Sequence, residues 1–141
     1  MKRIAAFLLL LSLLVVSCSA LSSCGRNGVI SQYRAVGFVR SQSPTGASAS
    51  FLSFSGRYVF DLRAAADGTI YYMARLDQGE MELSYVINGK KKQLCSVKAG
   101  DPVEASGGEI KKGDYVSVIM ETISDAEEGA VTFRLTDSAE P

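Results

Sequence analysis

The side chains that most often do chemistry in proteins are scarce in this chain. It has three cysteines and no histidine among its 141 residues. Without an imidazole, neither a Ser-His-Asp triad nor a Cys-His pair can form. The commonest metal ligand is missing for the same reason, and a zinc site drawn from cysteines and carboxylates alone is implausible. The sequence therefore predicts that the protein is not an enzyme, with no catalytic residues, no bound metal and no cofactor.

Carboxylates are the remaining candidates for chemistry. Asp125, Glu127 and Glu128 in "SDAEEGA" offer the oxygen ligands that calcium prefers. No EF-hand-like spacing accompanies them, so we expect a solvated turn between the last two strands. A glycosidase can work with two carboxylates alone. The side chains available for such a pair are Asp61, Asp77, Glu80 and Glu82. Nothing in the sequence selects two of them.

The first residues have the pattern of an export signal. Lys2 and Arg3 supply two positive charges, and Ile4 to Val16 follow as thirteen residues in which only Ser12 is polar. A basic start followed by an apolar run of this length is typical of a secretory signal peptide. A membrane-spanning helix needs about 20 apolar residues, so the run is short for a permanent anchor.

The end of this signal resembles the lipobox of bacterial lipoproteins, in which an aliphatic residue and two small residues precede a cysteine. Leu21-Ser22-Ser23-Cys24 fits that pattern, and Val15-Val16-Ser17-Cys18 fits it less well. The resemblance implies that the cysteine sulfur receives a diacylglyceryl group and that cleavage makes this cysteine the new N-terminus. Two acyl chains on one residue suffice for stable membrane attachment, whereas one chain does not. Cys24 is the preferred attachment site, and Cys18, directly against the apolar run, is the alternative.

The choice between these cysteines decides the state of Cys95. With Cys24 lipidated, Cys95 is a lone thiol in an exported protein, which is unusual. With Cys18 lipidated, Cys24 and Cys95 could form a disulfide. Because free cysteine is among the most buried residue types, we expect Cys95 in "KQLCSVKAG" to be a small buried side chain rather than a nucleophile.

Composition suggests one domain behind the signal. We expect a signal peptide over residues 1–23, a lipidated N-terminus with first strands and a Ser/Gly-rich linker over 24–50, and the folded domain over 51–141. Loss of residues 1–23 removes Lys2 and Arg3 and leaves 13 basic against 15 acidic groups. A net charge of −2 provides no electrostatic footprint for nucleic acid. About 118 residues are enough for one hydrophobic core.

After residue 50 the chain alternates between apolar and polar residues with the period of β-strands. The residues expected inward are Tyr58, Phe60 and Leu62, then Ile70, Tyr72, Ala74 and Leu76, then Met81, Leu83, Tyr85 and Ile87, and finally Val131, Phe133 and Leu135. Glu82 and Ser84 are expected outward. Turns are expected at Asp67-Gly68, Gln78-Gly79 and Asn88-Gly89, and the last pair is a strong hairpin signal.

"YVSVIMET", residues 115–122, is apolar on both faces, which is typical of a central strand. No segment shows a sustained helical period, and turn signals recur every 8 to 12 residues or so, as in all-β sandwiches and barrels. The predicted fold is therefore all-β, an antiparallel sandwich of two sheets, jelly-roll-like, behind the signal peptide.

From "GRYVFDL" onward the pattern also resembles the jelly-roll modules appended to secreted bacterial proteins, notably the pre-peptidase C-terminal type. The segments "FDLRAAADGTIYYMARL" and "KKGDYVSVIMET" stand where that family has strand–turn–strand and a later "G-x-Y-x-x-x-V" motif. The resemblance implies a β-sandwich, and its members often bind carbohydrate or assist a neighbouring enzyme.

The strand "TIYYMARL" supplies the candidate partner-binding residues. If alternation places Ile70 and Tyr72 in the core, Tyr71, Met73 and Arg75 form a row on the other face. Aromatic residues, Met and Arg are enriched at interfaces. The competing interpretation is that the segment around Tyr33 and Phe38 covers this row.

These observations favour a membrane-tethered lipoprotein on the extracytoplasmic side of the cell envelope. It would act as a non-catalytic binding or interaction module for a glycan, a peptide or another envelope protein. The alternative is a structural or accessory subunit of an envelope complex, without a small-molecule ligand.

Overall fold

A computed structural model describes residues 27–138 of the protein. Its elements are seven strands: β1 (Gln32–Val36), β2 (Val39–Ser43), β3 (Gly46–Arg63), β4 (Gly68–Ile87), β5 (Lys90–Lys98), β6 (Val103–Ile110) and β7 (Tyr115–Asp137). The predicted all-β class is confirmed. No helix within residues 27–138 could cross a membrane.

All pairings in the sheet are antiparallel, in the order β1-β3-β7-β4-β5, with β2 also paired to β3 and β6 also paired to β4. β2 pairs with the first part of β3 and β1 with its middle. In the same way, β5 and β6 pair with the second and first parts of β4. The sheet is therefore three long strands, β3, β7 and β4, flanked on each side by an edge strand broken in two.

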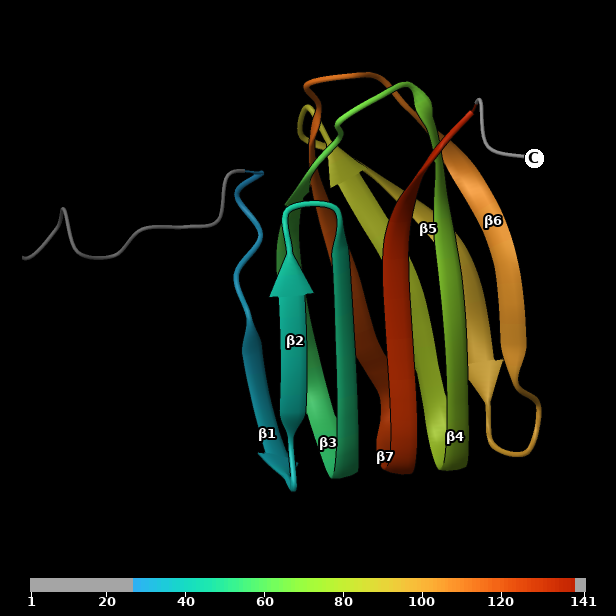
Figure 1. Ribbon diagram of the computed structural model, residues 1–141. Helices are drawn as coiled ribbons and strands as arrows, with labels where there is room; N and C mark the ends of the chain where they lie inside the picture. Colours follow the sequence, from blue (N-terminus) through green and yellow to red (C-terminus); the bar gives the residue numbers. More distant parts are fainter. Residues whose placement is uncertain (1–26, 139–141) are drawn as a thin grey trace, which may run out of the picture.

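This sheet is folded double. The loop 64–67 joins Arg63, which is opposite Tyr115 at the start of β7, to Gly68, which is opposite Asp137 at its end. Four residues can connect these points only if the two ends of β7 lie close together. The long strands bend at the bottom of Figure 1. The loops that join β2 to β3, β3 to β4, β4 to β5 and β6 to β7 lie at its top, and the β1–β2 and β5–β6 connections lie at its bottom.

We name the parts of this antiparallel sandwich as follows. The first layer contains β2, β6 and residues 46–54, 68–78 and 126–137 of the long strands. The second layer contains β5 and residues 57–63, 80–87 and 115–121. The crease is the bend between the layers, which β1 flanks, and the closed end is the opposite end, where the other four loops lie.

The crease depends on backbone conformations that few residues adopt. Gly56 and Gly79 have φ of 116° and 90°, and Glu128 has φ of 46°. A Cβ on Gly79 would lie 2.2 Å from the carbonyl oxygen of Asp125, so only glycine fits there. The turns predicted at Gln78-Gly79 and in "SDAEEGA" were wrong, because these residues bend β4 and β7 without ending them.

The predicted linker within residues 24–50 was also wrong. β2 and the start of β3 form a hairpin around Pro44 and Thr45, so the sandwich extends to the N-terminal side of the expected boundary at residue 51. The small residues of this segment belong to a strand, because Ala47 and Ala49 pack in the core with only 6% and 4% of their surface exposed. Their backbone is hydrogen-bonded on both sides, by β2 and by β7.

The core lies between the two layers and follows the predicted alternation. The largest fully buried side chains include Phe54, Phe60, Phe133, Ile70, Met81 and Leu83. Asn88 and Gly89 have φ of 53° and 75°, as the hairpin signal predicted. β7 is the central strand, and Val116 to Met120 are buried whichever face they point to.

Candidate binding face on the first layer

The structure places Tyr71, Met73 and Arg75 on the outer face of the first layer, as the alternation predicted. The next strand is the last part of β7, and the register sets Arg134 beside Tyr71 and Thr132 beside Met73. The row thus becomes part of a wider surface built by several strands.

β6, β3 and β2 complete this surface. Glu104 is opposite Met73 on one side, and Ser48 is opposite Thr132 on the other. Because side chains alternate across a sheet, residues in register share a face. The open face, as we call it, consists of Ser41, Ser43, Ser48, Ser50, Ala130, Thr132, Arg134, Tyr71, Met73, Arg75, Glu104 and Ser106.

Tyr71 is held by neighbours from two strands. Its hydroxyl donates a hydrogen bond of 2.6 Å to the Glu104 carboxylate, and the Arg134 guanidinium lies 4.8 Å from its ring centroid. The hydrogen bond to Glu104 is the main cause that raises the pKa of Tyr71, with desolvation second. This end of the row is therefore preorganised, with the ring and both charges in fixed positions.

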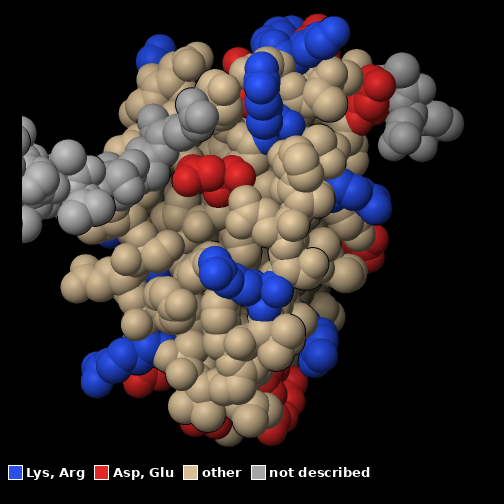
Figure 2. Space-filling view, turned by 60° about the vertical axis from the view of Figure 1, so that its left-hand side comes forward, with Lys and Arg blue, Asp and Glu red and all other residues tan. Residues whose placement is uncertain are grey.

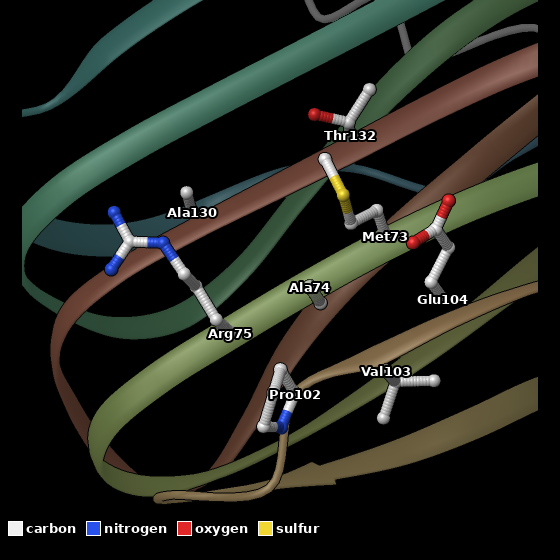
Figure 3. Close-up of a pocket in the computed structure, with 8 residues that line it drawn as sticks. All are labelled: Met73, Ala74, Arg75, Pro102, Val103, Glu104, Ala130 and Thr132. Carbon is white, nitrogen blue, oxygen red and sulfur yellow. The ribbon is translucent and has the colours of Figure 1, made fainter.

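A hollow of about 320 Å³ lies beside the row (Figure 3). Its lining residues are Met73, Ala74, Arg75, Pro102, Val103, Glu104, Ala130 and Thr132. In Figure 3, Arg75 and Glu104 lie on opposite sides, with apolar groups between them. Met73 is 44% exposed, which is high for a large apolar side chain. An apolar floor between opposite charges can recognise a ligand.

A second, shallower hollow of about 270 Å³ continues the open face toward β2. It shares Thr132 with the first hollow and is lined mainly by small and hydroxyl-bearing residues, among them Ser41, Ser43 and Ser48. Short side chains keep this part low, so the open face is a broad depression rather than a deep pocket.

The segment predicted to compete for the row lies elsewhere. The rings of Tyr33 and Phe38 pack on Phe54 and Tyr58, with centroids 5.1–5.8 Å apart. Arg40 lies over the Tyr58 ring and donates a hydrogen bond to its hydroxyl. The interpretation that Tyr33 and Phe38 cover the row is therefore wrong. They close the sandwich at the edge formed by β1 and β2.

The candidate carboxylates of the described residues are divided between the crease and the second layer. No group of three or more acidic or cysteine side chains within residues 27–138 is placed to hold a metal ion. Glu128 hydrogen-bonds to Asp77, and this raises the pKa of Glu128. Asp61 is far from that pair, on the second layer, where it accepts a 2.6 Å hydrogen bond from the Ser117 hydroxyl.

Of the three cysteines, the structure describes one. Cys95 lies on β5 opposite Leu83 and is half-buried, and this burial raises the pKa of its thiol. A thiol with a raised pKa is a weaker nucleophile at neutral pH. Cys18 and Cys24, the candidate lipid attachment sites, lie outside the described residues.

Comparisons with known proteins show similarity of fold only. A GH26-CBM35 β-(1,4)-mannanase from Podospora anserina is 11% identical (TM-score 0.40) over 82% of this chain and 27% of its own. A family 35 carbohydrate-binding module from Clostridium thermocellum is 15% identical (TM-score 0.32; 72% and 85% covered). A cupin superfamily protein from Desulfitobacterium hafniense is 15% identical (TM-score 0.30; 77% and 79% covered). No family model and no curated protein match the chain.

Sequence reasoning found one strand of the open face and missed the others. Thr132 and Arg134 could have been placed outward, because they alternate with the inward residues Val131, Phe133 and Leu135. Glu104 could not, since "VEASGGEI" lacks an apolar alternation. Which strands lie beside β4 depends on the folding of the sheet, and no local pattern shows it.

Proposed function

We propose that the protein is a membrane-tethered lipoprotein whose sandwich is a non-catalytic binding module, with the open face as its binding surface. The observation that carries this proposal is the exposed row of Tyr71, Met73 and Arg75 beside the 320 Å³ hollow. The absence of histidine supports a binding role over a catalytic one.

The ligand that best suits this surface is a peptide segment of another envelope protein. The hollow has apolar groups from Met73 and Val103 between Arg75 and Glu104, and such a combination is typical of protein interfaces. Sugar rings are commonly stacked on tryptophan or tyrosine. The chain has no tryptophan, and the one tyrosine on the open face already lies under Arg134.

Site-specific photo-crosslinking in intact cells tests the binding surface. A photoreactive amino acid at Met73 is expected to give a defined protein adduct. The control is Ile123, which is 58% exposed but lies at the crease. An adduct from position 123 and none from position 73 would contradict the proposal, and a glycan adduct at position 73 would change the ligand class.

Lipid attachment is tested separately by metabolic labelling with a fatty acid. We expect Cys24→Ser to lose the label and Cys18→Ser to keep it, because only the processed cysteine carries the diacylglyceryl group. Label that persists in Cys24→Ser and is lost in Cys18→Ser would assign the anchor to Cys18. Label that persists in both would contradict a lipobox anchor.

A second candidate function is that of a structural subunit, and one surface feature favours it. Val36, Val39 and Leu52 are 60–66% exposed near the crease, and Leu52 lies against Gly37 between the two valines. Exposed apolar groups of this kind mark protein–protein contacts when they form a patch. If this is the working surface, Leu52→Asp abolishes complex formation while changes to the open face do not.

A further inference from the structure

The chain enters the sandwich at its closed end. The Asn27 side-chain amide donates hydrogen bonds to the backbone oxygens of Val86 and Tyr115 and to the Ser117 hydroxyl. These residues lie beside the Asn88-Gly89 turn, and Asn27 also lines a hollow with that turn. The point at which a lipid-anchored N-terminus would leave the domain is thus fixed at this end.

The closed end is also where the lysines gather. Five of the six lysines within residues 27–138 lie there, Lys90 to Lys92 after the hairpin turn and Lys111 and Lys112 in the loop before β7. In Figure 2, blue side chains crowd the upper end of the visible face. The sixth lysine, Lys98, ends β5 at the crease.

Asp67, Glu109, Asp114 and Asp137 lie at the closed end, and each has an interaction partner. Glu109 forms an ion pair with Lys111 at 2.9 Å. Asp67 and Asp114 accept backbone hydrogen bonds of 2.8 and 2.9 Å from the lysine-bearing loop. The two ion pairs found within residues 27–138, Arg57–Glu121 and Glu109–Lys111, do not involve Lys90 to Lys92. The hydrogen bond from Lys111 is the main cause that lowers the pKa of Glu109, and the charge of Lys92 lowers it further.

Acidic side chains outnumber basic ones at the crease, where Lys98, Arg34, Arg57 and Arg75 also lie. The acidic residues in and around it are Asp77, Glu80, Asp101, Asp125, Glu127 and Glu128. Red side chains lie along the lower rim of Figure 2, with blue side chains at its lower left and lower right. The net charge of the chain is near zero, but the lysines of residues 27–138 are concentrated at the closed end, and many of the acidic residues lie at the crease. Such an asymmetry orients a protein in an external field.

We propose that the closed end rests on an anionic lipid surface, with Lys90 to Lys92 against the headgroups and the acidic crease pointing away. This inference rests on the proposed lipid attachment at Cys24. Two residues separate Cys24 from Asn27, and the three steps along the chain span at most about 11 Å. The Debye length is about 10 Å at 0.1 M salt, so charges held at that distance act on the membrane surface.

The acidic crease lies too far from the lipid surface to be repelled by it. Eight to ten strand residues separate the closed end from the crease, which corresponds to about 30 Å. That is about three Debye lengths at 0.1 M salt. In this orientation the strands stand upright on the bilayer, and the open face points sideways, accessible to a partner in the envelope.

Tryptophan quenching of the full-length, lipidated protein tests the orientation. Because the chain has no tryptophan, a single introduced one reports on its own position. Ala65→Trp places it at an exposed position of the loop 64–67 at the closed end, and Leu52→Trp places it at the crease. In vesicles of phosphatidylglycerol and phosphatidylcholine with spin-labelled headgroups, we expect quenching several-fold stronger for Ala65→Trp. Equal quenching of the two would overturn the proposal.

Two matched charge reversals separate electrostatics from tether length. Lys90 and Lys98 begin and end the same strand, β5. In the Ala65→Trp background, Lys90→Glu is expected to weaken quenching and Lys98→Glu to leave it unchanged, and the difference should vanish in vesicles of phosphatidylcholine alone. Equal effects of the two reversals would contradict a role for the lysines.

Vesicle flotation distinguishes a wrong orientation from a missing anchor. Protein that fails to float with the vesicles contradicts the proposed lipid attachment. Protein that floats but shows equal quenching at both positions contradicts only the orientation. A tether from Cys18, with eight intervening residues and a reach of about 32 Å over nine steps along the chain, would give this second result.

Discussion

The two outer faces of the sandwich differ sharply. On the second layer, Ile119 and Val86 are buried although they point away from the core, and they line a hollow with Val29 and Ile30 of the entering chain. On the first layer, Met73 is 44% exposed and the described residues place no segment over it. One face therefore belongs to the protein's own packing, and the other is available to a partner.

The residue pattern of β7, which passes through both layers, reflects this difference. Residues 116–120 are buried on both faces because chain covers their outer side, whereas residues 130–136 alternate because their outer side faces solvent. Ser84 shows that covering the outer face of the second layer costs free energy. It points outward, as predicted, but it is buried beside Ile119, and its hydroxyl has no hydrogen-bond partner within the described residues. An unsatisfied buried hydroxyl typically costs about 1–3 kcal/mol.

The largest effect is expected at the crease that separates the two faces. Gly79→Ala would force a Cβ against the Asp125 carbonyl at a φ of 90°, so we expect a loss of about 3 kcal/mol or more of unfolding free energy. Gly89→Ala is the control. It has a φ of 75° but nothing within 4 Å of its Cβ, and should cost about 1–2 kcal/mol. Equal losses in urea unfolding would show that the crease is not tightly packed.

The next prediction compares the two faces directly. Ile119→Ala on the covered face is expected to cost about 2–4 kcal/mol, as large-to-small changes at buried sites do. Met73→Ala on the open face should cost less than about 1 kcal/mol, because Met73 already contacts water. Thermal unfolding of both variants measures the difference. Similar losses would mean that the open face is covered too.

A smaller effect is expected from the contact that fixes the entering chain. Asn27→Ala removes the side-chain hydrogen bonds to Val86, Tyr115 and Ser117 and should cost about 1–2 kcal/mol. Hydrogen exchange should then become faster at residues 84–86 and 117–119 and remain unchanged at residues 71–75. Faster exchange confined to residues 71–75 would reverse the assignment of the two faces.

The smallest predicted effect concerns pH. The hydrogen bond with Asp77 raises the pKa of Glu128, so the folded protein holds this proton more tightly than the unfolded chain does. Stability from this pair is therefore present at low pH and is lost as pH rises through the window above the ordinary glutamate value of about 4.3. Asp77→Asn should remove that loss in a pH series of unfolding midpoints. An unchanged pH profile would mean that the pair is not coupled.

The sequence was sufficient for the parts of the fold that depend on local period. Alternation placed Ile70, Tyr72 and Phe133 in the core, and the Asn88-Gly89 pair identified its hairpin. It failed where a bend replaced a turn, as at Gly79, because glycine with positive φ suits both and only the pairing with β7 distinguishes them.

For the open face, the sequence could indicate which side chains point outward but not which strands lie together. Tyr71 and Met73 were predicted from their own strand. Their partners Arg134 and Glu104 are 63 and 31 residues further along the chain than Tyr71 and Met73, respectively, and reach them through the long-range register of the sheet. Local patterns do not encode such distances.

The unfolding free energy of the double variant Tyr71→Ala with Met73→Ala tests most directly whether the open face is a true surface. If it is, the pair should cost about 1–2 kcal/mol, from the hydrogen bond to Glu104 and the contact with Arg134. Core residues of this size cost roughly 2–5 kcal/mol each. A measured loss above about 4 kcal/mol would show that the row is packed inside, and the binding face proposed for it would have to be abandoned.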